Sequence, residues 1–160
     1  MAGESTIVGW FAVAAIVLVG LLAGVHLAGI GGLNRALRAL PAEVYIKTKQ
    51  SMDRELPAVA KPLTIAALLA MAGTTISAAV SGAAAGAVLA GVGTLAGLVA
   101  LVAVLRGDVP INRLMDTWDP AEPPADWQRW RERWEGAFVV RATALLGAFG
   151  CLVATGVVIR

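Results

Sequence analysis

The chain has 160 residues, of which 58% are hydrophobic and only 15% are charged. Together with a mean hydropathy of +0.76, this composition excludes an ordinary soluble domain and indicates a membrane protein in contact with a lipid bilayer. The formal net charge of +2 is too small to indicate a nucleic-acid partner, and we expect none.

Four apolar segments follow one another along the chain. The first covers residues 7–30, and the tail before it contains no Lys or Arg, so we expect a retained span rather than a cleaved signal peptide. Residues 62–105 contain no charged side chain and no histidine. One helix of that length would measure about 66 Å, roughly twice the thickness of a hydrocarbon core. The segment must therefore cross the membrane twice, as spans 62–82 and 84–105 with a turn near Ser81-Gly82.

The fourth apolar segment covers residues 137–159 and contains Cys151, the only cysteine. A lone cysteine excludes an intramolecular disulfide and a cysteine-based zinc site. The sequence thus predicts a single domain over residues 1–160, with an all-α fold: an integral membrane four-helix bundle with cytoplasmic helical extensions.

The distribution of Lys and Arg indicates the orientation of this bundle. Loop 31–61 contains six such residues and loop 106–136 contains five, whereas the turn between the second and third spans contains none. Because positive residues concentrate on the cytoplasmic side, we expect both charged loops in the cytoplasm and both termini outside. The abundance of Ala, Gly and Arg suggests a bacterial source, so we expect a multi-pass protein of a bacterial plasma membrane.

Proline and glycine residues predict the course of the two loops. Pro41 is expected to end the first helical segment, after which residues 42–56 form a helix with an apolar face of Val44, Met52, Leu56 and the following Val59. In the second loop we expect a sharp bend at Gly107 and Pro110 and an extended, acidic connector over residues 116–124. From Asp126, an expected N-cap, the pattern is helical and continues into the fourth span.

His26, the only histidine, lies near the cytoplasmic end of the first span. An ionisable side chain within a span usually faces the bundle interior or a cavity. There an imidazole could act as a general base or bind a substrate carbonyl. The alternative is a neutral histidine that donates one hydrogen bond to a neighbouring helix. A histidine-rich metal site is not possible within this chain, and we predict no metal site.

Arg141 continues an aromatic stripe into the fourth span. At helical spacing it shares one face with Trp127, Trp130, Trp134 and Phe138. This pattern fits an aromatic-walled pocket at the cytoplasmic mouth, in which Arg141 holds an anionic or phenolate group of a flat aromatic molecule. It also fits an interfacial tryptophan belt with an arginine that reaches the headgroups.

Three further polar residues could face the same mouth. Asn112 follows the third span and could bind either backbone or a ligand, and Tyr45 and Asp53 share the predicted helix of the first loop. Beside the aromatic stripe, Arg131 and Glu135 are four residues apart and are expected to form a solvated pair within their helix.

Four segments together form a pattern that covers nearly the whole chain: residues 40–57, 109–112 (VPIN), 118–127 (WDPAEPPADW) and 141–146 (RATALL). This pattern resembles the anthrone oxygenase-like family, a large group of small four-span membrane proteins. It implies the oxidation of an anthrone to an anthraquinone with molecular oxygen and without a dedicated organic cofactor. It further implies that Asn112 and Arg141 donate hydrogen bonds to the substrate and that Trp134 forms a pocket wall.

The chain also departs from this family pattern. Many relatives have one histidine directly before the residue that matches Gln50 and another after the Trp/Arg-rich helix. Lys49 and the pair Gly136-Ala137 stand at these places. If the base of the reaction is a histidine in this protein, only His26 can supply it.

The sequence leads to two functional hypotheses of different classes. The first is a membrane-embedded oxygenase or oxidoreductase that acts on a hydrophobic, anthrone-like molecule with oxygen as co-substrate. The second is a non-catalytic membrane subunit that docks a partner protein or a second copy through its Trp/Arg helix. In the enzyme hypothesis the catalytic residues are His26, Asn112 and Arg141, and the substrate-binding residues are Tyr45, Asp53, Trp130, Trp134 and Phe138. A transporter fits poorly, because few ionisable residues fall within the spans.

Overall fold

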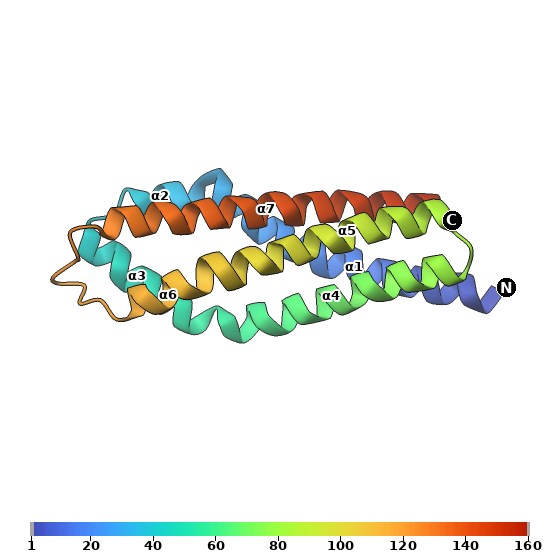
Figure 1. Ribbon diagram of the computed structural model, residues 1–160, viewed down its shortest axis with the longest axis horizontal. Coiled ribbons are helices and arrows are strands. Elements are labelled where there is room, and N and C mark those ends of the chain that lie inside the picture. The colour runs from blue at the N-terminus through green and yellow to red at the C-terminus, as the bar shows by residue number, and fades with distance from the viewer. Residues whose placement is uncertain (1, 160) are drawn as a thin grey trace.

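The structure, a computed structural model, describes the backbone of residues 2–159 and the side chains of residues 8–159. It is an all-α bundle of long helices that run alternately up and down (Figure 1). In chain order its elements are α1 (Ala2–Ala28), the π-helical turn η1 (Gly29–Leu33), α2 (Asn34–Arg38), α3 (Ala42–Glu55), α4 (Pro57–Val80), α5 (Ala84–Ala103), the π-helical turn η2 (Val104–Asp108), α6 (Val109–Asp116) and α7 (Trp127–Val158).

Four helical segments are long and apolar enough to cross a membrane: Val8–Arg38, Pro57–Val80, Ala84–Asp116 and Trp127–Val158. Their outer faces carry large apolar side chains, since Leu21, Leu69 and Leu95 are 57%, 67% and 64% exposed. Lipid can cover such a surface, and each helix satisfies its own backbone hydrogen bonds. The chain is a multi-pass membrane protein, and the predicted all-α four-helix bundle is confirmed.

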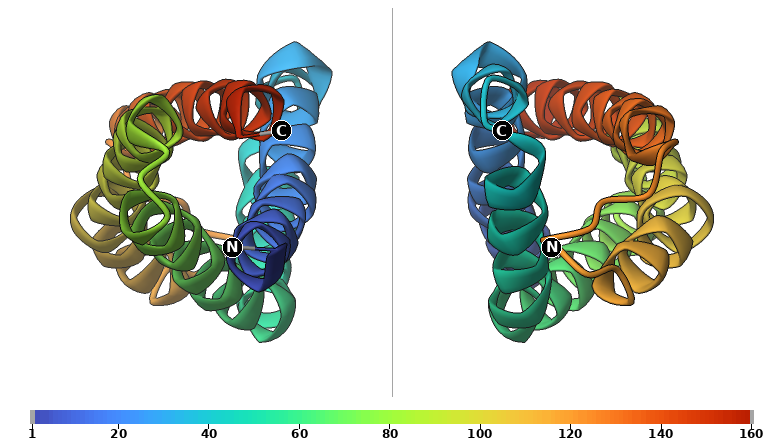
Figure 2. Two further views of the ribbon diagram at one scale, coloured as in Figure 1. Left: turned by 90° about the vertical axis from the view of Figure 1, so that its right-hand side faces the viewer. Right: turned by 90° about the vertical axis from the view of Figure 1, so that its left-hand side faces the viewer.

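The spanning helices form a ring in which α1 contacts α4 and α7, and α5 contacts α4 and α7 (Figure 2). Small residues line the contacts of α5, where Gly93 lies against Ala148 and Cys151 of α7 and Gly97 lies against Met71 of α4. A methyl group added to Gly93 would lie 3.3 Å from the Cβ of Cys151. Close approach of backbones supplies the dispersion contacts that hold helices together in lipid.

The predicted turn between the second and third spans is present. Gly82 has a φ of 77°, a left-handed conformation that glycine adopts without steric cost. This turn lies at the same end of the bundle as the two termini (Figure 1). The opposite end, which we call the extension end, carries α2, α3, α6 and the connector of residues 117–126.

The expected sharp bend at Gly107 and Pro110 is wrong. The helix that begins at Ala84 instead continues through η2 into α6 and ends at Asp116. Pro110 lies in the first turn of α6, where the N–H that proline lacks is least needed. The wider bonding pattern of the π-helical turn takes up the irregularity just before it. The second loop is therefore shorter than predicted.

The apolar face expected for α3 is also wrong. Val44, Leu56 and the following Val59 are exposed, and only Met52 of that set packs toward the interior. The buried face of α3 consists of Tyr45, Ile46, Lys49 and Gln50. Two of these four residues are polar, so a search for apolar periodicity cannot identify this face.

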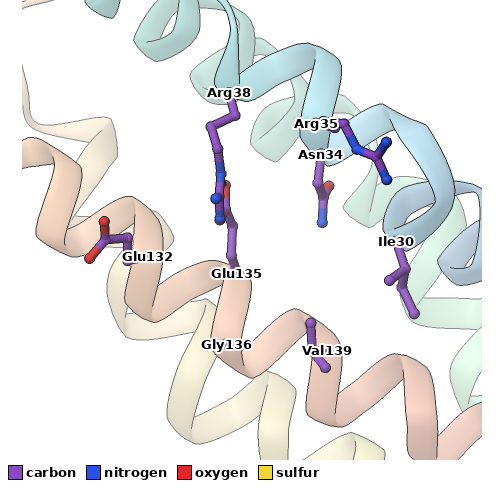
Figure 3. A pocket seen from close by; sticks show the side chains of 8 residues that line it. All are labelled: Ile30, Asn34, Arg35, Arg38, Glu132, Glu135, Gly136 and Val139. Carbon is purple, nitrogen blue, oxygen red and sulfur yellow. Dashed lines mark hydrogen bonds and ion pairs between the residues drawn. The ribbon is translucent and has the colours of Figure 1, made fainter.

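Glu135 does not form a solvated pair. Its side chain is only 9% exposed, and its carboxylate pairs with Arg38 of α2 (Figure 3). Arg131 of the same helix lies 4.0 Å from this carboxylate. The extension of the first span beyond the apolar segment is what brings Arg38 to α7. This ion pair fastens α2 to the start of the fourth helix.

Candidate functional site

Both π-helical turns lie against the same part of α7. Gly29 of η1 lies against the ring of Phe138, and a Cβ at this position would overlap the ring. Gly107 of η2 lies against Ala137, and its Cβ would come within 2.5 Å of the Cβ of Ala137. π-helical turns are frequent at functional sites because they alter which side chains face inward. Here they position the residues before and after them around Phe138.

His26 stacks on Phe138, with ring centroids 5.1 Å apart and planes inclined by 26°. Its Nδ1 lies 2.6 Å from the carbonyl oxygen of Leu22. Because a carbonyl only accepts, Nδ1 carries the hydrogen, and Nε2 of the neutral ring is left with a lone pair. The guanidinium carbon of Arg141 lies 4.9 Å from the centroid of the same phenyl ring. The structure thus brings together His26, Phe138 and Arg141, three of the predicted site residues.

Arg141 forms an ion pair with Asp108, the last residue of η2. The two side chains are 16% and 3% exposed. Within the part of the chain that the structure describes, Asp108 Oδ1 and Arg141 Nε are buried without a hydrogen-bond partner. Asp108 is not among the predicted site residues. No local pattern could have done so, because the partner lies 33 residues away on an antiparallel helix.

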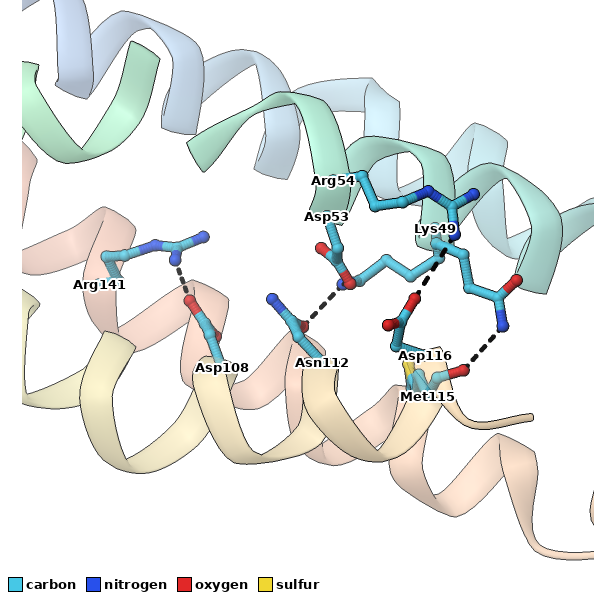
Figure 4. Close-up of polar contacts among 9 residues, drawn as sticks. Lys49, Asp53, Arg54, Asp108, Asn112, Met115, Asp116 and Arg141 are labelled. Carbon is cyan, nitrogen blue, oxygen red and sulfur yellow. Dashed lines mark hydrogen bonds and ion pairs between the residues drawn. The ribbon is translucent and has the colours of Figure 1, made fainter. Parts of the chain in front are cut away.

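Lys49 of α3 is only 2% exposed and lies at the centre of the polar interior. Its ammonium group donates to the carboxylate of Asp53 and, over 2.7 Å, to Oδ1 of Asn112 (Figure 4). The same Nζ lies 4.6 Å from the centroid of the Trp134 ring. Three predicted site residues, Asp53, Asn112 and Trp134, therefore meet around a lysine that the prediction left out. The sequence signal was its position in the family pattern that the chain resembles, where a histidine is expected.

Burial dominates the electrostatics of this pair. Desolvation lowers the pKa of Lys49, although the attraction of Asp53 acts in the opposite direction, and the positive charge of Arg141 lowers it further. Desolvation likewise raises the pKa of Asp53, against the attraction of Lys49. For both groups the free-energy cost of burying a charge exceeds the attraction of the oppositely charged partner. The charged forms of Lys49 and Asp53 are therefore less strongly favoured over the neutral forms than in water, which suits proton exchange with a ligand.

Tyr45 and Trp130 lie further toward the connector. Tyr45 is 1% exposed, and its ring centroid lies 5.6 Å from that of Trp127. Burial raises the pKa of Tyr45 to about 12, and its hydroxyl has no partner among residues 8–159. Trp130 packs against the cluster that contains Trp134 and donates its indole N–H to Asp126 over 3.0 Å. Asp126 thus binds a side chain of the first turn of α7 in place of the expected backbone cap.

Gln50 holds α3 against the end of α6. Its amide group donates to the carbonyl oxygen of Met115 over 2.9 Å, a contact drawn in Figure 4. It also donates to the carbonyl oxygen of Trp118 over 3.0 Å. Arg54 and Asp116 add an exposed ion pair at 3.5 Å on the same side. These contacts fix the position of α3 and thereby the depth at which Lys49 enters the bundle.

The site offers N–H donors, two carboxylates and flat aromatic walls within one layer of the bundle. N–H groups of Lys49, Asn112 and Arg141 can bind a phenolate or enolate oxygen, and the rings of Trp134 and Phe138 lie directly beside these donors. Among the described side chains no group of three or more His, Cys, Asp or Glu residues is arranged to hold a metal ion. Comparisons of the chain with protein-family models, curated proteins and solved structures give no significant match.

Proposed function

We propose that this protein is a membrane-embedded oxidoreductase of the anthrone oxygenase-like type, which oxidises a flat, hydrophobic aromatic molecule with molecular oxygen. The observation that supports it most is the position of the buried Lys49 ammonium group between Asn112 and the face of Trp134. A polar group at this depth is costly unless a ligand or partner uses it. An aromatic molecule with an acidic C–H and a phenol or carbonyl oxygen fits both the donors and the walls.

The chemistry balances without an organic cofactor. A base removes one proton from the acidic CH2 group, and the charge of the carbanion spreads to the conjugated oxygen, which the N–H donors stabilise. Oxygen then forms a bond to this carbon, takes up the electron pair and gives a peroxide. Loss of the second proton of the CH2 group, with cleavage of the O–O bond, leaves a carbonyl group and one molecule of water.

We assign the role of base to His26. Its Nε2 holds a lone pair, because Nδ1 donates to the carbonyl of Leu22, and its ring stacks on the aromatic wall of Phe138. Lys49 and Asn112 then hold the oxygen of the substrate, and Arg141, fixed by Asp108, supplies further N–H groups. The burial of Lys49 and Asp108 limits the access of water, which would otherwise quench the carbanion.

A test uses the purified protein in detergent with an anthrone under oxygen. We expect anthraquinone absorbance to rise faster than with heat-treated protein, with one O2 consumed per product. His26→Ala and Lys49→Met should lower the rate by about 10²-fold or more, the usual effect of losing a base or an oxyanion donor. Thr143→Ala is the matched control, since this exposed hydroxyl bonds only to Val139 of its own helix. Full activity of both site variants, or no activity in the wild type, contradicts the proposal.

The scaffold hypothesis has less support. The surface it requires is the Trp/Arg face of α7, yet Trp134 is buried, Trp127 packs on Tyr45 and the guanidinium of Arg131 lies 4.8 Å from the Trp127 ring. These aromatic groups are occupied within the chain. A polypeptide that copurifies at fixed stoichiometry would nevertheless favour the scaffold.

We further propose that the extension end faces the cytoplasm of a bacterial cell, with both termini on the outer side. The support is the concentration of Lys and Arg at that end. In a Cys151→Ser background, Lys47→Cys and Arg113→Cys should react with an impermeant maleimide only after the cells are permeabilised. Ser81→Cys should react in intact cells, and the reverse pattern contradicts this orientation.

A further inference from the structure

A groove of about 350 Å³ opens on the outer side of the bundle, between the helix of α1 and α2 and the helix α7 (Figure 3). It is lined by Ile30, Asn34, Arg35, Arg38, Glu132, Glu135, Gly136 and Val139. None of these residues belongs to the site of Lys49 and His26. The groove lies where the apolar part of the first span ends and its charged extension begins.

Both walls of the groove change from apolar to charged side chains toward the extension end. α2 continues the first helix toward the extension end, whereas α7 begins at that end, so residue numbers rise along one wall and fall along the other. Exposed Ile30 and Val139 therefore face each other at the bilayer side. Glu132 lies about 6 Å closer to the extension end than Gly136, at 1.5 Å per residue. The groove is therefore apolar at its end near the bilayer and charged at its end near the extension end.

The charged side chains of the groove lie at different distances from the bilayer. Arg38 and Glu135 neutralise each other in the ion pair described above. Arg35 and Glu132 are exposed and have no ion-pair partner among residues 8–159. Arg35 is the deeper of the two by the same residue count, next to the amide of Asn34, and Glu132 lies farther out on the opposite wall (Figure 3).

We propose that this groove binds a phospholipid with a zwitterionic aminoethyl phosphate headgroup. Arg35 and Asn34 donate to the phosphate, the carboxylate of Glu132 accepts from the ammonium group, and an acyl chain lies along Ile30 and Val139. In such a lipid the phosphate lies next to the acyl chains, and the ammonium group lies farther from them. Arg35 and Asn34, the donors, are likewise closer to the apolar end of the groove than Glu132, the acceptor. The bilayer is the source, because the apolar end of the groove is continuous with the lipid-facing surface.

Gly136 provides a way to block the groove without disturbing the bundle. A Cβ built on Gly136 meets no other atom within 4 Å. Gly136→Leu therefore fills the space between the walls, and leucine is a better helix former than glycine. Loss of lipid binding in this variant can thus be separated from loss of folding.

The test measures lipid binding to the purified full-length protein by native mass spectrometry. The probes are dioleoyl phosphatidylethanolamine, dioleoyl phosphatidylglycerol, which lacks the ammonium group, and glycerophosphoethanolamine, which lacks the chains. We expect the first to bind roughly 3- to 10-fold more tightly than the second, the net effect of one hydrogen bond at an exposed site, and the third not to bind measurably.

Variants assign the two ends of the headgroup. Glu132→Gln should abolish the preference between the two lipids, Arg35→Gln should weaken both, and Gly136→Leu should prevent binding of both. Arg129→Gln and Glu122→Gln, which change exposed charges outside the groove, are the controls and should leave binding unchanged. Equal binding of the two lipids by the wild type overturns the proposal. So does unchanged binding in Gly136→Leu, or a change in its oligomeric state alone, which would identify a protein interface.

Discussion

The guanidinium group of Arg141 and the carboxylate of Asp108 form an ion pair inside the bundle, between α7 and the end of η2. Removing one partner leaves the other charge buried and unpaired, so Asp108→Asn should lower the free energy of unfolding by about 3–5 kcal/mol. Unfolding of the protein in mixed micelles with increasing SDS measures this change. A loss below about 1 kcal/mol would show that the pair is solvated.

The double variant Asp108→Leu with Arg141→Met is the companion to that measurement. It removes both charges and replaces them with apolar groups, so the unfolding free energy should recover most of the loss. Additive losses from the two sites would contradict direct pairing.

The buried lysine predicts a particular pH dependence. Burial holds the pKa of Lys49 below its ordinary value of 10.5. Between the lowered pKa and 10.5 the unfolded chain binds more protons than the folded protein, so the Lys49 contribution to stability rises as the pH rises through this window. Lys49→Met should lack this rise, whereas Lys61→Met, at an exposed lysine, should retain it. SDS titrations at a series of alkaline pH values compare the three proteins.

Tyr45 allows a direct spectroscopic titration, because it is the only tyrosine in the chain. Its pKa is raised from 10.0 to about 12, chiefly by burial. In the folded protein the phenolate absorbance near 295 nm should therefore appear only as the pH approaches 12, and in SDS-unfolded protein near 10. The stabilising contribution of Tyr45 is complete below pH 10 and is lost between these two values. Ionisation near pH 10 in the folded protein would place the phenol in water.

Two glycines test the close approach of η2 to α7. Gly107→Ala places a methyl group 2.5 Å from the Cβ of Ala137, which has no flexible end to move. The helices must shift apart, at a cost of about 1–3 kcal/mol in unfolding free energy. Gly147→Ala, whose Cβ meets nothing within 4 Å, should be neutral or stabilise by up to about 1 kcal/mol. Equal effects of the two substitutions would show that this contact is loose.

The fold follows from the sequence because the signals for it are local. A charge-free run longer than one membrane thickness requires two spans, and the positive φ of Gly82 lies where that argument put the turn. The spacing of Trp134, Phe138 and Arg141 likewise fixes one face of one helix. The structure turns that face inward, onto Lys49 and Asp108.

The parts that sequence reasoning missed depend on distant contacts. Lys49 is buried because α3 folds back onto α6, and hydropathy assigns a lysine to the surface. Asp108 acquires its role only when α5 and α7 pack side by side. The π-helical turns are a matter of backbone hydrogen-bond register, which side-chain hydropathy does not encode.

Those π-helical turns have a consequence for how the protein can change in length. Each accommodates one residue more than an α-helical ladder would need, so deleting a residue from η1 would restore the regular ladder and leave the two flanking segments nearly in phase. A deletion elsewhere in the first span would instead rotate everything beyond it by about 100° and point the basic side chains of α2 away from α7. Gly29–Leu33 is thus the place in this helix where one codon can be lost without turning its charged tip.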